Sequence, residues 1–142
     1  MPLINFGSIL NFAEELETSD HAFYTSAAEN PLCADYKEIF EQFAADGKKN
    51  KQTILRARRE NVTEMILEPI RDFTRSPFHV VCGNSDTMSA EDVLDTARKL
   101  EERAERYYTE AALKIKALSE VSRILKTIAK KRAVHRKRLR DA

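Results

Sequence analysis

The segment FAEELETSDHAFYTSAAE (residues 12–29) decides the fold, because its pattern recurs 84 residues later in ARKLEERAERYYTEAA (residues 97–112). In each copy a glutamate, Glu17 or Glu101, stands seven residues before a tyrosine, and a threonine and a pair of alanines follow that tyrosine. Seven residues are about two helical turns, so each glutamate shares the apolar stripe of its helix with the tyrosine. The repeat predicts two matching helices, each of which directs a carboxylate toward the core.

Helical periodicity extends beyond this repeat. Apolar residues recur with the helical period in four segments, which we predict to be helices over residues 8–29, 35–67, 89–117 and 119–140. The period fails over residues 70–88, so one long link lies between two short ones. This arrangement is typical of a four-helix bundle with a single crossover. We therefore predict an all-α bundle with one long crossover between helices 2 and 3, which run parallel.

Length and composition agree with this fold. The chain has 142 residues and a formal net charge of +1, and it contains only 3 Gly and 4 Pro. A β-sandwich or barrel would need many more turn residues. We expect a single domain over residues 1–142. There is no apolar run of membrane-spanning length, and the N-terminal residues lack the basic region of a secretory signal, so we expect a cytoplasmic protein without a membrane partner.

The cysteines and the charged residues carry weaker signals. Cys33 and Cys82 form no C-x-x-C motif, so we expect free thiols, although Cys82 and His79 on the crossover are a weak redox or metal pair.

The first 46 residues hold nine acids and one base, whereas the last 17 hold eight bases and one acid. Such a basic helix can bind nucleic acid. The alternative, which the small net charge favours, is pairing with the acidic half of the same molecule or of a dimer partner.

The repeated segments resemble the first and third helices of the rubrerythrin-like branch of the ferritin-like superfamily. The segments EIFEQFAADGKKNKQTI (residues 38–54) and ILKTIAKKRAVHRKRL (residues 124–139) resemble its second and fourth helices. The resemblance implies a ferritin-like four-helix bundle. It also implies a di-iron carboxylate centre with oxidase or peroxidase activity, built from one Glu on each of two helices and Glu-x-x-His on each of the other two.

When the ligand pattern of the family is aligned with this chain, three of its six ligand positions hold a matching residue. Glu17 and Glu101 match the single glutamates of helices 1 and 3, and His135 matches one of the two histidines. These three residues are the candidate metal ligands. His135 can equally be a hydrogen-bonded core residue, which is the more common role of a single histidine on an apolar stripe.

The other three ligand positions are lost. The resemblance puts Gly47 and Arg132 where the bridging glutamates would stand, and Asn50 where the second histidine would stand. We therefore expect a degenerate di-iron site. Without metal, two facing carboxylates in a core would repel each other, and the guanidinium of Arg132 can lie between them, with Gly47 leaving it room. The alternative is that Arg132 extends to solvent beside its basic neighbours.

Four further residues flank this site in the sequence. Tyr24 and Tyr108 are expected in the core, where they surround the polar cluster and their hydroxyls form hydrogen bonds to it. His21 could replace a lost ligand by its spacing from Glu17, but we expect it to be exposed. Asp46, next to the lost bridging position, is expected to reach the site only if the helix is distorted.

Three functions follow from these patterns. We favour a metal-free bundle that acts as a binding or structural module, forms a homodimer, and has no cofactor and no enzymatic activity. The second possibility is residual iron binding with oxidoreductase activity through Glu17, Glu101 and His135. The third is anion or nucleic-acid binding through residues 126–140.

Overall fold

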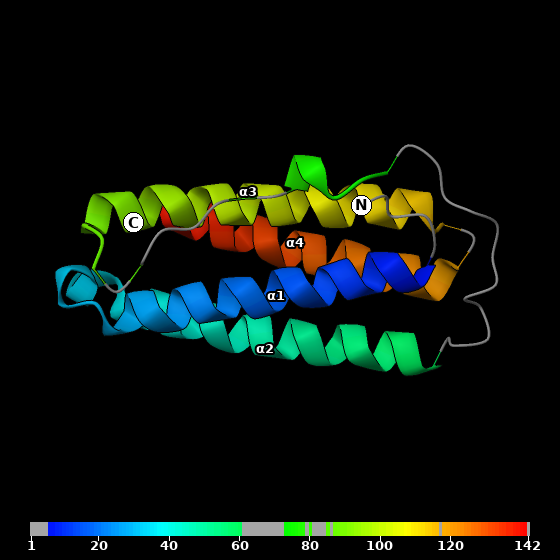
Figure 1. Cartoon of the computed structure of the whole chain (residues 1–142), viewed down its shortest axis with the longest axis horizontal. Coiled ribbons are helices and arrows are strands. Elements are labelled where there is room, and N and C mark those ends of the chain that lie inside the picture. The colour runs from blue at the N-terminus through cyan, green and yellow to red at the C-terminus, as the bar shows by residue number, and fades with distance from the viewer. Residues whose placement is uncertain are drawn as a thin grey trace.

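The computed structural model describes residues 6–60, 73–78, 80, 85, 87–116 and 118–141 (Figure 1). Its four long helices are α1 (Phe6–Glu29), α2 (Lys37–Glu60), α3 (Ala90–Lys114) and α4 (Ser119–Asp141). The predicted all-α four-helix bundle is therefore confirmed. The predicted end of the second helix at residue 67, and the pair formed by His79 and Cys82, lie outside the described residues.

The order of the helices follows the predicted connectivity. α1 packs closely along α2, and α3 packs closely along α4. α2 ends at one end of the bundle and α3 begins at the other, so these two helices run in the same direction (Figure 1). The chain therefore crosses the length of the bundle between α2 and α3, as the single long crossover predicts.

A short 3₁₀ helix, η1 (Pro31–Tyr36), turns the chain between α1 and α2. Asn30 caps this turn, because its Oδ1 accepts a hydrogen bond from the N–H of Leu32 at 2.9 Å. Its Nδ2 also donates to the carbonyl of Met88 at 2.8 Å, which ties the turn to the start of α3. Since η1 takes up the residues before it, α2 begins at Lys37 rather than at residue 35.

The ends of α3 and the start of α4 lie close to their predicted positions. The Oγ of Ser89 accepts a hydrogen bond from the N–H of Asp92 at 3.2 Å, which is the N-cap that the sequence predicts. α3 ends at Lys114, three residues before the predicted end, because Ile115 leaves the helical conformation at φ −115°. α4 then begins at Ser119.

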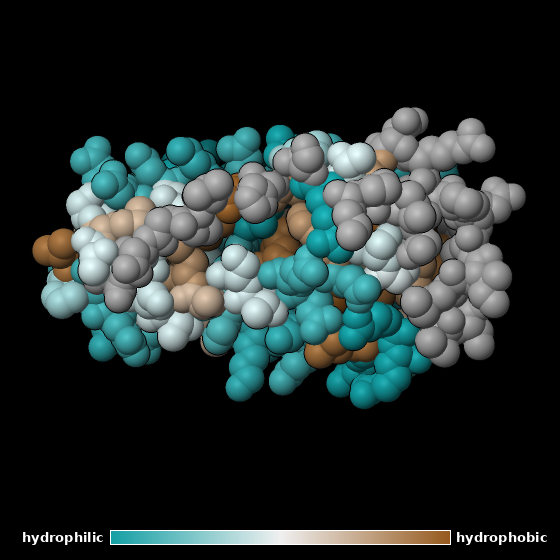
Figure 2. Space-filling model, in the orientation of Figure 1, coloured by the Kyte–Doolittle hydropathy of each residue, from teal (hydrophilic) through white to brown (hydrophobic). Residues whose placement is uncertain are grey.

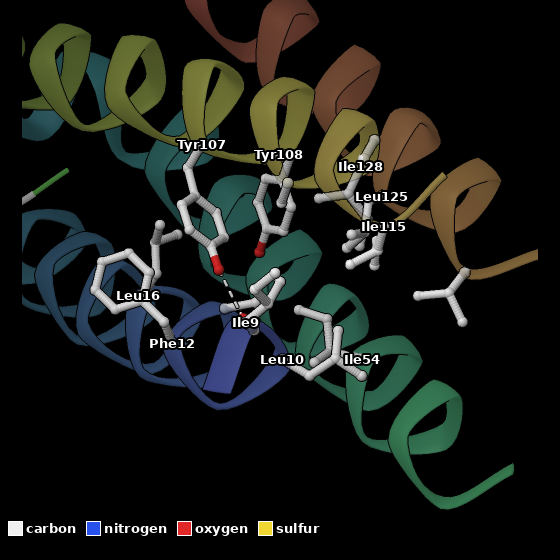
Figure 3. Close-up of a cluster of buried hydrophobic side chains, with 14 of the residues drawn as sticks. Ile9, Leu10, Phe12, Leu16, Ile54, Tyr107, Tyr108, Ile115, Leu125 and Ile128 are labelled. Carbon is white, nitrogen blue, oxygen red and sulfur yellow. Dashed lines mark hydrogen bonds between the residues drawn. The ribbon is translucent and has the colours of Figure 1, made fainter. Parts of the chain in front are cut away.

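Two apolar clusters fill the core and leave a polar layer between them. One contains Phe12, Ile54 and Tyr107, and the Tyr107 hydroxyl donates to the carbonyl of Ile9 at 2.6 Å (Figure 3). The other surrounds Phe40. On every helix the buried residues between the two clusters are polar or glycine. This layer consists of Glu17, Asp20, Gly47, Asn50, Glu101, Arg103, Arg132 and His135.

The outer surface is largely hydrophilic. On the face shown in Figure 2, hydrophobic residues are visible mainly in the seams between the helices. Within the described ranges, no helix is both long and apolar enough to span a membrane. The polar layer in the core, rather than an exposed apolar patch, is therefore the feature that most needs a functional explanation.

Candidate functional site

Arg132 lies at the centre of the polar layer and is not exposed at all. Its Nη1 lies 3.3 Å from Oε2 of Glu101 and 3.8 Å from Oε2 of Glu17. Its Nη2 donates a hydrogen bond to Oδ2 of Asp20. The structure thus places the guanidinium among three carboxylates from α1 and α3, and not in solvent with its basic neighbours.

The two tyrosines of the sequence repeat bind the glutamates crosswise. The Tyr24 hydroxyl on α1 donates to Oε2 of Glu101 on α3 at 2.6 Å. The Tyr108 hydroxyl on α3 donates to Oε1 of Glu17 on α1 at 2.8 Å. The repeat in the sequence therefore becomes an approximate twofold arrangement in space, with both tyrosines fully buried.

His135 lies between two carboxylates. Its Nδ1 is 2.9 Å from Oε1 of Glu101, and its Nε2 is 2.8 Å from Oδ2 of Asp46. The imidazole ring also stacks on Phe43, with 3.9 Å between the ring centroids. A neutral imidazole can donate from only one nitrogen, so both contacts are satisfied together only when the ring is doubly protonated or when one carboxyl carries the proton.

The contact with Asp46 corrects one expectation. We expected Asp46 to reach the site only through a distortion of the second helix, but α2 is a continuous α-helix from Lys37 to Glu60. Asp46 instead lies at the edge of the polar layer, half-buried, and reaches His135 across the interface between α2 and α4. The side chain therefore needs no change in the backbone to meet its partner.

Asn50 and Gly47, which we predicted to be lost ligand positions, lie on the side of α2 that faces α1. The Nδ2 of Asn50 donates a long hydrogen bond of 3.4 Å to Oε1 of Glu17. A Cβ added at Gly47 would lie 3.5 Å from Oε2 of Glu17 and 3.8 Å from Cβ of His21. The atoms nearest to this added Cβ belong to α1, and Oε2 of Glu17 lies 3.8 Å from Nη1 of Arg132, so the expectation that Gly47 makes room for the guanidinium stays a prediction.

Sequence reasoning missed two members of the site, Asp20 and Arg103. Asp20 is buried, and its Oδ1 accepts a hydrogen bond from Nη2 of Arg103 at 2.5 Å. Arg103 also donates to the carbonyl of Phe78 at 3.4 Å. A signal for Asp20 existed, since it stands three residues after Glu17 and so shares its helix face.

The two matching glutamates differ in their electrostatics. Burial raises the pKa of Glu17 above its ordinary value of 4.5, and Arg132 offsets only part of this effect. Burial acts on Glu101 in the same direction, but Arg132 and His135 together bring the pKa of Glu101 below 4.5. The difference follows from their neighbours, because His135 lowers the pKa of Glu101, whereas the nearby carboxylate of Asp20 raises the pKa of Glu17.

Arg132 is held in its charged form by the same carboxylates. Burial alone would lower the pKa of Arg132, but Glu101, Glu17 and Asp20 raise it well above its ordinary value. The centre of the polar layer is therefore a permanent positive charge.

Other candidate residues lie outside this layer. His21 is partly exposed and its Nδ1 lies 2.7 Å from the carbonyl of Ala44, so the structure does not bring it into the cluster. Cys33 is buried and free, and burial raises the pKa of its thiol. On the basic helix α4, Arg136 forms an ion pair with Glu105 at 3.1 Å.

The residues present do not fit a di-iron centre. Of the carboxylate oxygens of Glu17 and Glu101, only Oε2 of Glu17 lacks a hydrogen-bond partner, and Arg132 lies beside it. A divalent cation there would meet the fixed charge of the guanidinium. Within the part of the chain that the structure describes, no group of three or more His, Cys, Asp or Glu residues is arranged to hold a metal ion.

Comparison with known proteins gives one match. A family model described as a ferritin-like domain matches residues 7–142, which is almost the whole chain. Neither the curated proteins nor the solved structures gave a match.

Proposed function

This chain belongs to the ferritin-like domain family, and from that premise we propose that it is a rubrerythrin-like bundle with an eroded di-iron site. It acts as a metal-free binding or structural module and not as an oxidoreductase. The charge that iron would supply between the helices comes instead from Arg132.

One observation carries this proposal, namely the position of Arg132. Its guanidinium lies between Glu17 on α1 and Glu101 on α3, the two residues that match the family's single glutamates. An arginine remains charged and cannot be displaced by a change of pH within the physiological range. It therefore places a permanent positive charge beside both carboxylates, whereas a metal ion would require them as free ligands.

The retained ligands are already used by the protein itself. Oε1 of Glu101 contacts His135, and Oε2 accepts from Tyr24. Oε1 of Glu17 accepts from Tyr108. Binding iron would require these hydrogen bonds to break and the guanidinium to leave a fully buried position, where an unpaired charge is very costly. Residual iron binding through Glu17, Glu101 and His135 is therefore disfavoured.

The remaining parts of the proposal concern the cell and the assembly. We propose a homodimer in the cytoplasm, with no cofactor. Size-exclusion chromatography with light scattering tests the dimer, because it reports the mass of the particle in solution.

Metal analysis tests the proposed function. Protein purified without chelator and then incubated with ferrous iron is expected to retain much less than one iron per chain after desalting. The control is the Lys131→Glu variant, which adds a carboxylate to the exposed face of the same helix and is expected to behave in the same way. A stoichiometry of about two irons per chain, the full complement of a di-iron centre, would overturn the proposal.

A further inference from the structure

Three polar atoms around Glu17 are buried and have no hydrogen-bond partner among the described residues. They are Oε2 of Glu17, Oδ1 of Asn50 and Nη1 of Arg132. Each belongs to a residue that is at most 1% exposed. A buried polar atom that pairs with nothing retains the full cost of losing its hydration, and such atoms are rare in folded proteins. These three atoms therefore need a common explanation.

The distances place these atoms around one small region of the core. Nη1 of Arg132 lies 3.8 Å from Oε2 of Glu17, which is too long for a direct hydrogen bond. The side-chain amide of Asn50 adjoins the same carboxyl group, because its Nδ2 donates to Oε1 of Glu17 at 3.4 Å. Buried polar groups that lie more than about 3.5 Å apart are often bridged by a water molecule.

The carboxyl group of Glu101, on the other half of the polar layer, has both oxygens paired. One of them contacts the ring of His135 at 2.9 Å, and the other accepts a hydrogen bond from a tyrosine at 2.6 Å. Tyr108, which points from α3 into the bundle (Figure 3), pairs with Oε1 of Glu17, but Oε2 has no equivalent partner. Here α2 supplies the amide of Asn50 where α4 supplies an imidazole. Because an amide has fewer atoms and a shorter reach, it leaves room beside Glu17 that a ring fills beside Glu101.

The chemistry of the three atoms selects the class of ligand. The carboxylate and amide oxygens of Glu17 and Asn50 accept hydrogen bonds, and Nη1 of Arg132 donates them. A ligand that pairs with all three must therefore donate twice and accept once. A halide or another anion only accepts and would face the carboxylate, whereas a cation would face the guanidinium. A water molecule can donate twice and accept, and buried waters typically make about three hydrogen bonds.

We propose that one ordered water molecule binds in the core, where it accepts from Nη1 of Arg132 and donates to Oε2 of Glu17 and Oδ1 of Asn50. The water links Glu17 to the guanidinium, which lies closer to Glu101, at 3.3 Å. It also connects α2 to α4 through the core, because Asn50 belongs to α2 and Arg132 to α4. The inference rests on the proposed metal-free core, since iron bound to Glu17 would take the same oxygen.

A crystal structure of the full-length chain, purified without chelator, tests the proposal. We expect one peak of water density within about 2.5–3.2 Å of all three atoms. Data collected at the iron absorption edge identify the peak. An anomalous signal there would mean that iron is bound, and would overturn both the proposed function and this inference. Absence of any peak would overturn the inference alone and leave the metal-free function standing.

Asn30 provides an internal control in the same crystals. It is nearly as buried as Asn50, with 2% of its surface exposed against 1%. The amide of Asn30 is already bonded to three backbone groups of the protein. No water is therefore expected at this amide. Ordered water bound to both amides would contradict the argument from unpaired atoms and overturn the proposal.

Replacing Asn50 by histidine is expected to displace the water. The longer ring should contact Glu17 directly, as His135 contacts Glu101 at 2.9 Å. The structure of Asn50→His should therefore show a ring nitrogen beside Oε2 of Glu17 and no separate water peak. The control Gln52→His adds the same ring at an exposed position of α2 and should leave the water in place. A peak that persists unchanged in Asn50→His, or that is lost equally in both variants, would overturn the proposal.

Discussion

Nη1 of Arg132 lies 3.3 Å from Oε2 of Glu101, and neither side chain is exposed to solvent. A buried pair of this kind is not by itself a strong source of stability, because both charges lose their hydration. Removing only one partner, however, leaves an uncompensated charge in the core. The structure therefore predicts that the partners of this pair are strongly coupled.

Replacing Arg132 by leucine is expected to destabilise the protein by about 3–5 kcal/mol, because buried carboxylates lose their counter-charge. Urea unfolding measures this change. Adding Glu17→Gln and Glu101→Gln to Arg132→Leu should recover part of the loss, since amides carry no charge. The control Lys131→Leu, at an exposed neighbouring position, should stay within about 0.5 kcal/mol of the wild type. Wild-type stability of Arg132→Leu would show that the guanidinium does not neutralise the core.

The loss of stability caused by Glu101→Gln and that caused by Glu17→Gln are expected to depend on pH in opposite directions. The lowered pKa of Glu101 means that its contribution to stability is present above its ordinary value of 4.5 and is lost as the pH falls through the lowered value. The cost of Glu101→Gln should therefore be largest near neutral pH and shrink in acid.

For Glu17 the sign is reversed. Its raised pKa means that its contribution is present below 4.5 and is lost as the pH rises through the raised value. Glu17→Gln should therefore be more harmful in acid than at neutral pH. Urea unfolding of both variants at about pH 4 and about pH 7.5 compares them directly. Parallel pH profiles would contradict the asymmetry assigned to His135 beside Glu101 and to Asp20 beside Glu17.

Each crosswise tyrosine is expected to stabilise the glutamate that it contacts. Tyr24→Phe and Tyr108→Phe each remove a donor from a buried carboxylate and should cost about 1.5–3 kcal/mol. Tyr107→Phe is the matched control, because the Tyr107 hydroxyl donates to a backbone carbonyl, and a neutral bond of this kind is worth about 0.5–1.5 kcal/mol. Thermal unfolding of the three variants gives the comparison. An equal loss of stability in all three variants would argue that the carboxyl groups that accept from Tyr24 and Tyr108 are not charged.

Gly47→Ala is expected to stabilise the protein. Its added Cβ would meet its nearest neighbour at 3.5 Å, an ordinary contact, and alanine is favoured over glycine inside a helix by about 1 kcal/mol. Chemical denaturation measures this gain. A destabilised Gly47→Ala variant would mean that the space beside Glu17 is needed by another group.

The helices and the repeat could be predicted from the sequence because helical periodicity is a local property. The same spacing correctly placed Glu17, Tyr24, Glu101 and Tyr108 on the apolar stripes, where the structure buries them. It could not show that Tyr24 binds Glu101 and not the glutamate on its own helix. That choice depends on the distance between α1 and α3, which no local pattern contains.

The missed parts of the site depend on contacts between distant segments. Asp20 shares the helix face of Glu17, but its burial depends on Arg103, which stands 83 residues later. The contact between Asp46 and His135 likewise depends on how closely α2 approaches α4. A sequence shows which residues share a face, whereas the pairing of charges across helices follows only from packing.

The most direct measurement of the central claim, that Arg132 stands where a di-iron centre would supply charge, is iron binding by a rebuilt site. The triple variant Gly47→Glu, Asn50→His and Arg132→Glu restores Glu-x-x-His on α2 and α4, with the members of each pair on one helix face. It is expected to take up ferrous iron and oxidise it in air, while the parent does neither. Imperfect supporting contacts could weaken binding by about 10–100-fold, so weak uptake still agrees with the claim. A stably folded triple variant that binds no iron at high concentration would contradict it.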